Sequence, residues 1–284
     1  VLDSPDIPLN VSRSYLQADG NVKKISSHIS KKVAEKLEQM YKNDKDEFIK
    51  KWNDLSIFIK YGMISDEKFY DRMSKVCQLK NTESNYFTFE EYKAKIETLQ
   101  TDKNKKLVYL YANNIDEQYS YIKAAKDKGY DVLLMDGILD NHFIQTLEHK
   151  FTDVKFARID SDTIEKLIEK DEVIPSKLSE EETNKLKTLV EAIVDKSKFT
   201  VQTESLEQTA YPFSITQNEF MRRMKEMAEM GGGGMASFYG DMPEHYNLVV
   251  NVNHPIMSQI LEEKDADKQT QTLSQRSPRR SGGR

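Results

Sequence analysis

The sequence predicts a mixed α+β and α/β fold in three parts. These are a helical segment, a small three-layer α/β subdomain with a short parallel sheet, and a mixed α+β C-terminal domain. Three observations predict this order: apolar residues recur at helical spacing over residues 21–100, three short apolar runs alternate with helical segments over 105–160, and helix and strand patterns follow a hydrophilic stretch at 169–185.

The helical part is predicted from periodicity and capping residues. Residues 21–42 carry one apolar stripe with lysines opposite, formed by Val22, Ile25, Ile29, Val33, Leu37 and Met40. A second helix is expected over residues 44–62, ended by Gly62. Thr88 and Glu91 have the spacing of a capping box, in which each side chain bonds the other residue's backbone N–H, and they predict a helix through Leu99.

Three strands are predicted in the middle of the chain, at residues 107–112, 130–136 and 154–160. Helical segments of about ten residues separate them, and Gly129 is expected to end the first of these helices. Strands separated by helices pair in parallel through right-handed crossovers. The sequence therefore predicts a small α/β layer over residues 105–160.

The hydrophilic stretch, interrupted by Pro175, places a domain boundary near residue 172. Beyond it, "SEEE" offers a helix cap, and helices are expected over 186–195 and 215–230, with strands at 198–204 and 246–253. The expected domains are therefore 1–172 and 173–262. Residues 263–284 have the polar composition of a disordered tail.

Composition excludes several classes of protein. The chain has 284 residues and a formal net charge of −5, which argues against nucleic-acid binding because that function favours a concentrated basic surface. Cys77 is the single cysteine, so an internal disulfide and a CxxC motif are excluded. No apolar run reaches the about 18 residues of a membrane span, and the N-terminus lacks a signal-peptide pattern. We expect a cytoplasmic location without a membrane partner.

Enzyme motifs are missing from the sequence. There is no GxxxxGK[ST], GxGxxG, HExxH or GxSxG segment, and the scattered histidines predict no metal site. The four glycines at 231–234 lack the lysine and hydroxyl of a nucleotide loop and favour a flexible hinge. One enzyme hypothesis remains, a small-molecule site at the carboxyl edge of the α/β layer near Asp136 and Gly137.

Arg13 and Gln17 lie one helical turn apart near the start of the chain. Both polar side chains could face one external anion, and a guanidinium group binds phosphate through two charge-assisted hydrogen bonds. Spacing alone favours the simpler interpretation, a surface salt bridge of Arg13.

A methionine-rich helix is expected near residue 220. Thr216 and Glu219 predict its capping box, with Ile215 and Phe220 as a hydrophobic staple. One face carries Phe220, Met224 and Met227 beside Met221, and the segment after the glycines adds Met235, Phe238 and Tyr239. Methionine is frequent on surfaces that bind many partners. The stripe could equally form core, and the sequence leaves both interpretations open.

Several segments resemble the ninety-kilodalton heat-shock chaperone family in its bacterial form. The specific one is "DSPDIPLNVSRSYLQ", and "KLVYLYANN", "YDVLLMDGILDNHFI" and "NHPI" follow in the family's order. The resemblance covers about residues 1–270. It implies the later part of the family's middle domain over 1–172, with the catalytic-arginine loop at 8–17 and a helical region at 21–100, and an incomplete client-binding and dimerisation domain over 173–262.

The resemblance implies a stress-response chaperone that uses ATP and assists the folding of unfolded or partly folded client proteins. Arg13, together with Gln17, would contact the terminal phosphate of ATP held in an N-terminal domain that precedes this chain in the family. We therefore do not expect the chain alone to hydrolyse ATP. The implied client-binding residues are Phe220, Met221, Met224, Met227, Met235, Phe238 and Tyr239.

Two further expectations concern partners. The resemblance implies a homodimeric parent protein. After Gln275 the family continues into apolar helices that form the dimer interface, but this sequence runs into RSPRRSGGR, which resembles an unrelated extension. We therefore do not expect this chain to dimerise constitutively. The alternative function is a nucleotide-independent holdase or protein-interaction module. That alternative requires partial exposure of Met221, Met224 or Met227.

Overall fold

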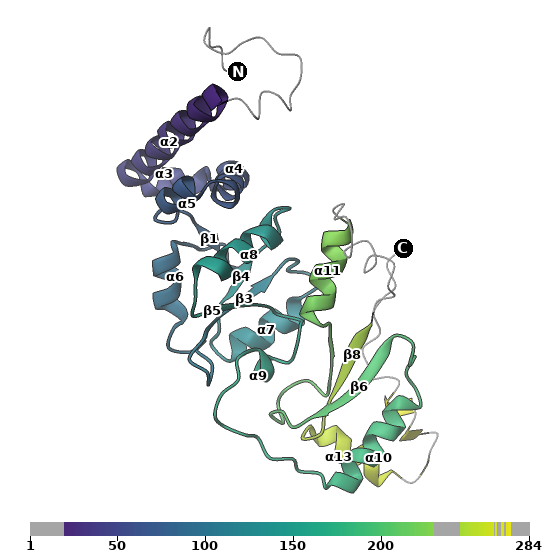
Figure 1. The fold of residues 1–284 in the computed structure, drawn as a ribbon. Helices are drawn as coiled ribbons and strands as arrows, with labels where there is room; N and C mark the ends of the chain where they lie inside the picture. Colours follow the sequence, from purple (N-terminus) through teal and green to yellow (C-terminus); the bar gives the residue numbers. More distant parts are fainter. Residues whose placement is uncertain (1–19, 230–244, 264, 266–267, 270, 274–284) are drawn as a thin grey trace. The chain divides into compact units, whose positions relative to one another are not determined.

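The computed structural model, drawn in Figure 1, describes residues 20–229, 245–263, 265, 268–269 and 271–273. The chain divides into two compact units. Unit 1 comprises residues 1–95 and 135–152, and unit 2 comprises 96–134 and 153–284. Both contain helices and strands, which confirms the predicted mixed α+β class. Among the described helices, none combines the length and the hydrophobicity that a membrane span requires. The domain boundary predicted near residue 172 stays a prediction.

Unit 1 is mainly helical. Its helices are α2 (Gly20–Asn43), α3 (Lys45–Lys50), α4 (Trp52–Ser65), α5 (Glu67–Met73), α6 (Phe89–Ile96) and α8 (Asp140–Lys150), and a short antiparallel pair is formed by β1 (Leu79–Lys80) and β2 (Tyr86–Phe87). Its buried core includes Phe48, Trp52, Ile59, Met63, Met73 and Phe143. The helices begin where the sequence places caps: Asp44 accepts from the Glu47 N–H, and Asp66 from the N–H groups of Lys68 and Phe69.

The capping box predicted at residues 88–91 is confirmed. The Thr88 N–H donates to Glu91 Oε2 at 2.8 Å, and the Glu91 N–H donates to Thr88 Oγ1 at 3.3 Å. The helix that it opens, α6, ends at Ile96 and not at Leu99.

Gly62 does not end a helix, so that prediction is wrong. It lies inside α4, and the predicted single helix over 44–62 is divided into α3 and α4 at Lys51. A Cβ atom at Gly62 would lie 2.6 Å from Cε1 of the buried Phe69. The glycine is therefore needed for the close approach of α5 to α4 and not for a left-handed cap.

Unit 2 contains the predicted parallel sheet. Its strand order is β4-β3-β5, with β3 (Leu107–Ala112) paired in parallel to β4 (Val132–Leu134) and β5 (Val154–Arg158). All six residues of β3 are buried. Helices α7 (Tyr119–Asp127) and α9 (Ile164–Leu167) contribute Ile122, Ala125 and Leu167 to one apolar cluster with the sheet. Gly129 follows α7 with a φ of 76°, as expected for a glycine that ends a helix.

A second sheet follows in unit 2, with strand order β6-β8-β7. Strand β8 (Tyr246–Asn251) is parallel to β6 (Phe199–Glu204) and antiparallel to β7 (Phe213–Thr216). Helices α10 (Glu180–Glu191) and α13 (Pro255–Glu262) lie beside this sheet (Figure 1). Their side chains Leu186, Val190, Met257 and Ile260 are buried in its apolar core.

Helices α10 and α13 are each capped by a side chain that lies next to the helix in the sequence. Ser179 and Glu182 form a complete capping box at α10. His254 caps α13 by accepting the Ile256 N–H on Nδ1, and Pro255 occupies the first turn, where the missing N–H has no partner to lose.

Candidate functional site

The methionine-rich helix is α11 (Glu219–Glu229), and its described side chains include those of the first turn. Asn218 caps it, since the Met221 N–H donates to Asn218 Oδ1 at 3.2 Å. The predicted cap is wrong: Thr216 ends strand β7, and its buried Oγ1 makes no hydrogen bond with the described residues. Glu219 does not bond back to the backbone of Thr216, because its carboxylate accepts hydrogen bonds from other side chains.

Glu219 joins α11 to the parallel sheet. The Tyr111 hydroxyl on β3 donates to Glu219 Oε1 at 2.7 Å, and Arg222 Nη2 donates to the same oxygen at 2.8 Å and to the Tyr111 hydroxyl at 2.8 Å. Arg223 Nε adds a third bond to Glu219 Oε1 at 2.7 Å. The Arg222 side chain is only 4% exposed, so this is a largely buried charge cluster.

Opposing effects act on the ionisation of these groups. Burial raises the pKa of Glu219, but Arg222, Tyr111 and Arg223 outweigh burial and hold the pKa below its usual value of 4.5. Burial, together with the Glu219 charge, raises the pKa of the Tyr111 phenol. At neutral pH, Glu219 is therefore a carboxylate and Tyr111 a hydrogen-bond donor.

Two apolar side chains of the same turn face solvent. Phe220 is 58% exposed and Met221 is 37% exposed, while Arg222 beside them is buried. Because the Glu219 cluster fixes this turn, the exposed pair is held on an anchored helix. Met224 and Met227 belong to α11, but their side chains lie outside the described residues, as do Met235, Phe238 and Tyr239.

Arg13 and Gln17 also lie outside the described residues. Their implied role at the ATP phosphate therefore stays a prediction. Among the residues that the structure does describe, no group of three or more His, Cys, Asp or Glu side chains could hold a metal ion.

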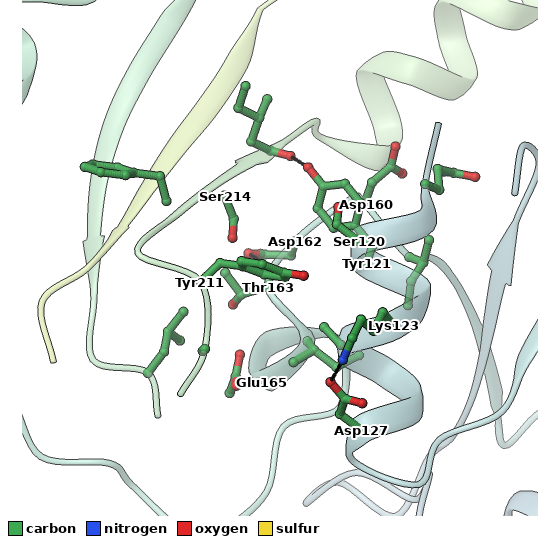
Figure 2. Close-up of a pocket in the computed structure, with 18 of the residues that line it drawn as sticks. Ser120, Tyr121, Lys123, Asp127, Asp160, Asp162, Thr163, Glu165, Tyr211 and Ser214 are labelled. Carbon is green, nitrogen blue, oxygen red and sulfur yellow. Dashed lines mark hydrogen bonds and ion pairs between the residues drawn. The ribbon is translucent and has the colours of Figure 1, made fainter. Parts of the chain in front are cut away.

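A cavity of about 1390 Å³ opens in unit 2 where strands β3 and β5 end. Figure 2 shows α7 on one side, with Ser120, Tyr121, Lys123 and Asp127, and the segment bearing Tyr211 and Ser214 on the other. The Tyr121 hydroxyl donates to the Ile215 carbonyl across it. The residues lining this cavity do not include Asp136 and Gly137, where sequence reasoning placed an enzyme pocket.

Buried asparagines hold the segment that forms the second wall. Asn251 Oδ1 accepts the Leu206 N–H and Asn251 Nδ2 donates to the Glu207 carbonyl, while Asn253 Nδ2 donates to the Leu206 carbonyl. Sequence reasoning missed the cavity residues Gln118, Asp162 and Thr163. They lie in the loops that follow β3 and β5, and this position is a usable signal because ligands bind at the carboxyl ends of parallel strands.

A family model described as Hsp90 protein matches residues 1–277, and the chain belongs to this family. Its relatives include the chaperone protein HtpG of Bacteroides thetaiotaomicron, which is 50% identical over 270 residues, and that of Porphyromonas gingivalis, 50% identical over 264 residues. The HtpG protein of Wigglesworthia glossinidia brevipalpis is 27% identical over 278 residues.

These matches cover 94%, 92% and 93% of this chain, and 39%, 38% and 41% of the respective relatives. The chain therefore spans about two fifths of the length of the curated relatives it matches. Membership of the Hsp90 family confirms the resemblance drawn from the arginine loop and the later motifs.

Proposed function

We propose that this chain is the client-binding part of an ATP-dependent chaperone, and that the exposed start of α11 contacts unfolded or partly folded proteins. One observation carries the proposal: Phe220 and Met221 are exposed on the first turn of α11. Glu219 and Arg222 of the same turn are hydrogen-bonded to each other, and Glu219 also bonds Tyr111 of the sheet. Unfolded chains offer apolar side chains, and burying one Phe or Met contributes about 1.5–3 kcal/mol. Family membership supports the same function.

Titration of a fluorescently labelled, permanently unfolded protein, followed by anisotropy, tests this surface. The double variant Phe220→Gln/Met221→Gln is expected to weaken binding at least about tenfold, because two apolar contacts are lost. A matched control is Phe58→Gln/Tyr61→Gln on α4, where two exposed side chains, 74% and 63% accessible, receive a comparable change. Unchanged binding by the α11 variant, or an equal loss in both variants, would overturn the assignment to α11.

We also propose that Arg13, with Gln17, contacts the terminal phosphate of ATP bound by a separate nucleotide domain. The support is the sequence "NVSR" within a chain that belongs to the Hsp90 family. The test uses a protein that joins this chain to a nucleotide domain of the family. In it, Arg13→Ala should lower the rate of ATP hydrolysis at least about tenfold, because arginines that stabilise the transferring phosphate in other enzymes raise the rate by more than this factor. Full activity of this variant would exclude the role.

The holdase alternative makes a different prediction in the same joined protein. A nucleotide-independent holdase binds the unfolded probe with the same affinity in the presence and absence of ATP. The proposed ATP-dependent chaperone changes its affinity for the probe when ATP is added, and Arg13→Ala reduces this change.

A further inference from the structure

The cavity in unit 2 is lined by twice as many carboxylates as cations. The carboxylates are Glu117, Asp127, Asp160, Asp162, Glu165 and Glu207, and the cations are Lys123, Lys128 and Arg158. A cavity with this balance attracts a positively charged ligand, because its walls exclude part of the solvent that would otherwise screen the charges.

Each lining cation already has a partner in the cavity wall. Lys123 Nζ lies 2.6 Å from Asp127 Oδ2, and Arg158 Nε donates to Asp160 Oδ1 at 2.5 Å. Lys128 Nζ lies 2.8 Å from Glu207 Oε1 and 3.3 Å from Glu165 Oε1. The negative charge of the remaining carboxylates is therefore not cancelled by these three side chains.

Asp162 is the carboxylate best placed for a ligand. It is partly buried, and no cation of the described chain lies within ion-pairing distance of it. Its Oδ1 accepts the Thr163 N–H at 2.8 Å. Burial raises the pKa of Asp162 above its usual value, although Thr163 and the more distant Lys166 oppose the shift. The charge of a ligand cation beside it would offset the cost of this desolvation.

Two nearly inaccessible side chains of the cavity wall have polar atoms without a hydrogen-bond partner in the described chain. Gln118, 3% exposed, accepts the N–H groups of Asn113 and Asn114 on Oε1 at 2.9 and 3.0 Å, which identifies the unpartnered Nε2 as a donor. Thr163, 6% exposed, has an unpartnered Oγ1. Buried polar atoms are nearly always bonded, so each of these two atoms would gain its missing partner from a ligand that reaches it.

Aromatic side chains complete the wall. Tyr121, Tyr211 and Tyr246 line the cavity, and Figure 2 shows Tyr211 on the wall opposite α7. A guanidinium group stacks on such rings as well as pairing with carboxylates. The volume of about 1390 Å³ exceeds the about 300–1,000 Å³ of pockets for drug-sized ligands and accommodates several residues of an extended peptide.

We propose that this cavity binds an extended arginine- or lysine-rich peptide segment, with a cationic side chain on Asp162 and a peptide carbonyl on Gln118 Nε2. The site is separate from the α11 surface and goes beyond the proposed client contact. One source of such a segment is the chain itself, whose residues 276–284 read RSPRRSGGR, with four arginines and no acid. The other source is a basic segment of a second protein.

The probe is a labelled peptide RSPRRSGGR. The protein is the full chain with its four tail arginines, Arg276, Arg279, Arg280 and Arg284, changed to Gln, so that the tail does not compete with the probe for the cavity. We expect binding by anisotropy, and no binding of a probe in which Gln replaces every Arg. Asp162→Asn should weaken binding about tenfold, because one charge-assisted bond is lost. Asn retains the acceptor for the Thr163 N–H, so the loop is preserved.

The control variant is Asp171→Asn, which removes the same charge from an exposed position outside the cavity. Equal weakening by both variants, or none by Asp162→Asn, would overturn the site. Thr163→Val is a second variant. It should weaken binding of the probe a fewfold without lowering the urea midpoint of unfolding, because the Thr163 hydroxyl makes no hydrogen bond with the described chain. Phe220→Gln/Met221→Gln should leave probe binding intact, and loss of binding there alone would assign the peptide to α11 and overturn the cavity site.

The wild-type chain then distinguishes the two sources. Weaker probe binding by the wild type than by the chain with the neutral tail supports the chain's own residues 276–284 as the occupant. Equal binding supports a basic segment of another protein. Absence of binding by both chains contradicts the proposal.

Discussion

The hydroxyl of Tyr111 and the carboxylate of Glu219, separated by 108 positions in the sequence, are joined by a hydrogen bond of 2.7 Å. Tyr111 lies on the central strand of the parallel sheet, and Glu219 begins α11. Arg222 bonds both, so the three side chains satisfy one another in a place with little access to water. Such clusters are sensitive to the loss of any one member, because a buried polar group is then left without a partner.

Tyr111→Phe tests this connection. The variant removes one bond to Glu219 and one from Arg222, and we expect the free energy of unfolding to fall by about 1–2 kcal/mol. The Met221 amide, which donates to Asn218, should exchange with solvent faster because the first turn of α11 is less firmly held. Urea denaturation and hydrogen exchange measure the two effects. Tyr130→Phe, at a hydroxyl not bonded to α11, should show neither.

Glu219→Gln should have an effect that depends on pH. The folded protein holds the pKa of Glu219 below its usual 4.5, so the carboxylate stabilises the fold above about pH 4.5 and this contribution is lost as pH falls through the folded pKa. At pH 7 we expect a loss of about 3 kcal/mol, because Arg222 keeps a buried charge without its carboxylate.

As the pH falls below 4, the difference in stability between wild type and Glu219→Gln should shrink. Urea midpoints measured at a series of pH values give this difference. Glu181→Gln, an exposed acid on α10, is the control, with a change below about 0.5 kcal/mol. A loss for Glu219→Gln that stays constant with pH would show that the carboxylate charge is not its cause.

Gly62→Ala should destabilise unit 1, although alanine favours a helix by about 1 kcal/mol over glycine. The added Cβ would lie 2.6 and 2.7 Å from two atoms of the Phe69 ring, and overpacking of this kind costs about 1–3 kcal/mol. The double variant Gly62→Ala/Phe69→Leu should recover part of the loss relative to the sum of the single variants. Stabilisation by Gly62→Ala alone would contradict the close packing of α4 and α5.

Cys77 should be unreactive in the folded chain. Burial raises the pKa of its thiol to about 12, with Lys60 opposing and Asp140 reinforcing the shift, and the side chain is inaccessible. Its reaction with a disulfide reagent at pH 8 should be at least about a hundredfold slower than that of the urea-unfolded chain, because the thiolate is the reactive form. Equal rates would mean that this part of unit 1 opens freely.

Much of the fold follows from local sequence signals. The apolar runs at 107–112 and 154–160 contain the strands β3 and β5, of which β5 ends at Arg158. Each run is short and bounded by polar segments, and the helical segments between the strands require parallel pairing. The caps at Thr88 and Ser179 follow from the same local logic, since each box involves residues three positions apart. Family membership was also readable from the arginine loop, because that motif is continuous in the sequence.

Only the tertiary structure determined the features that depend on contacts between residues distant in the sequence. Glu219 has the spacing of a capping residue, yet the buried Arg222 and Tyr111 offer its carboxylate stronger, charge-assisted bonds than the helix terminus does. Gly62 resembles a helix end, but the ring of Phe69 determines its role. The cavity with Asp162 arises because β3, β5 and the segment 206–217 meet in space, and no local pattern encodes that meeting.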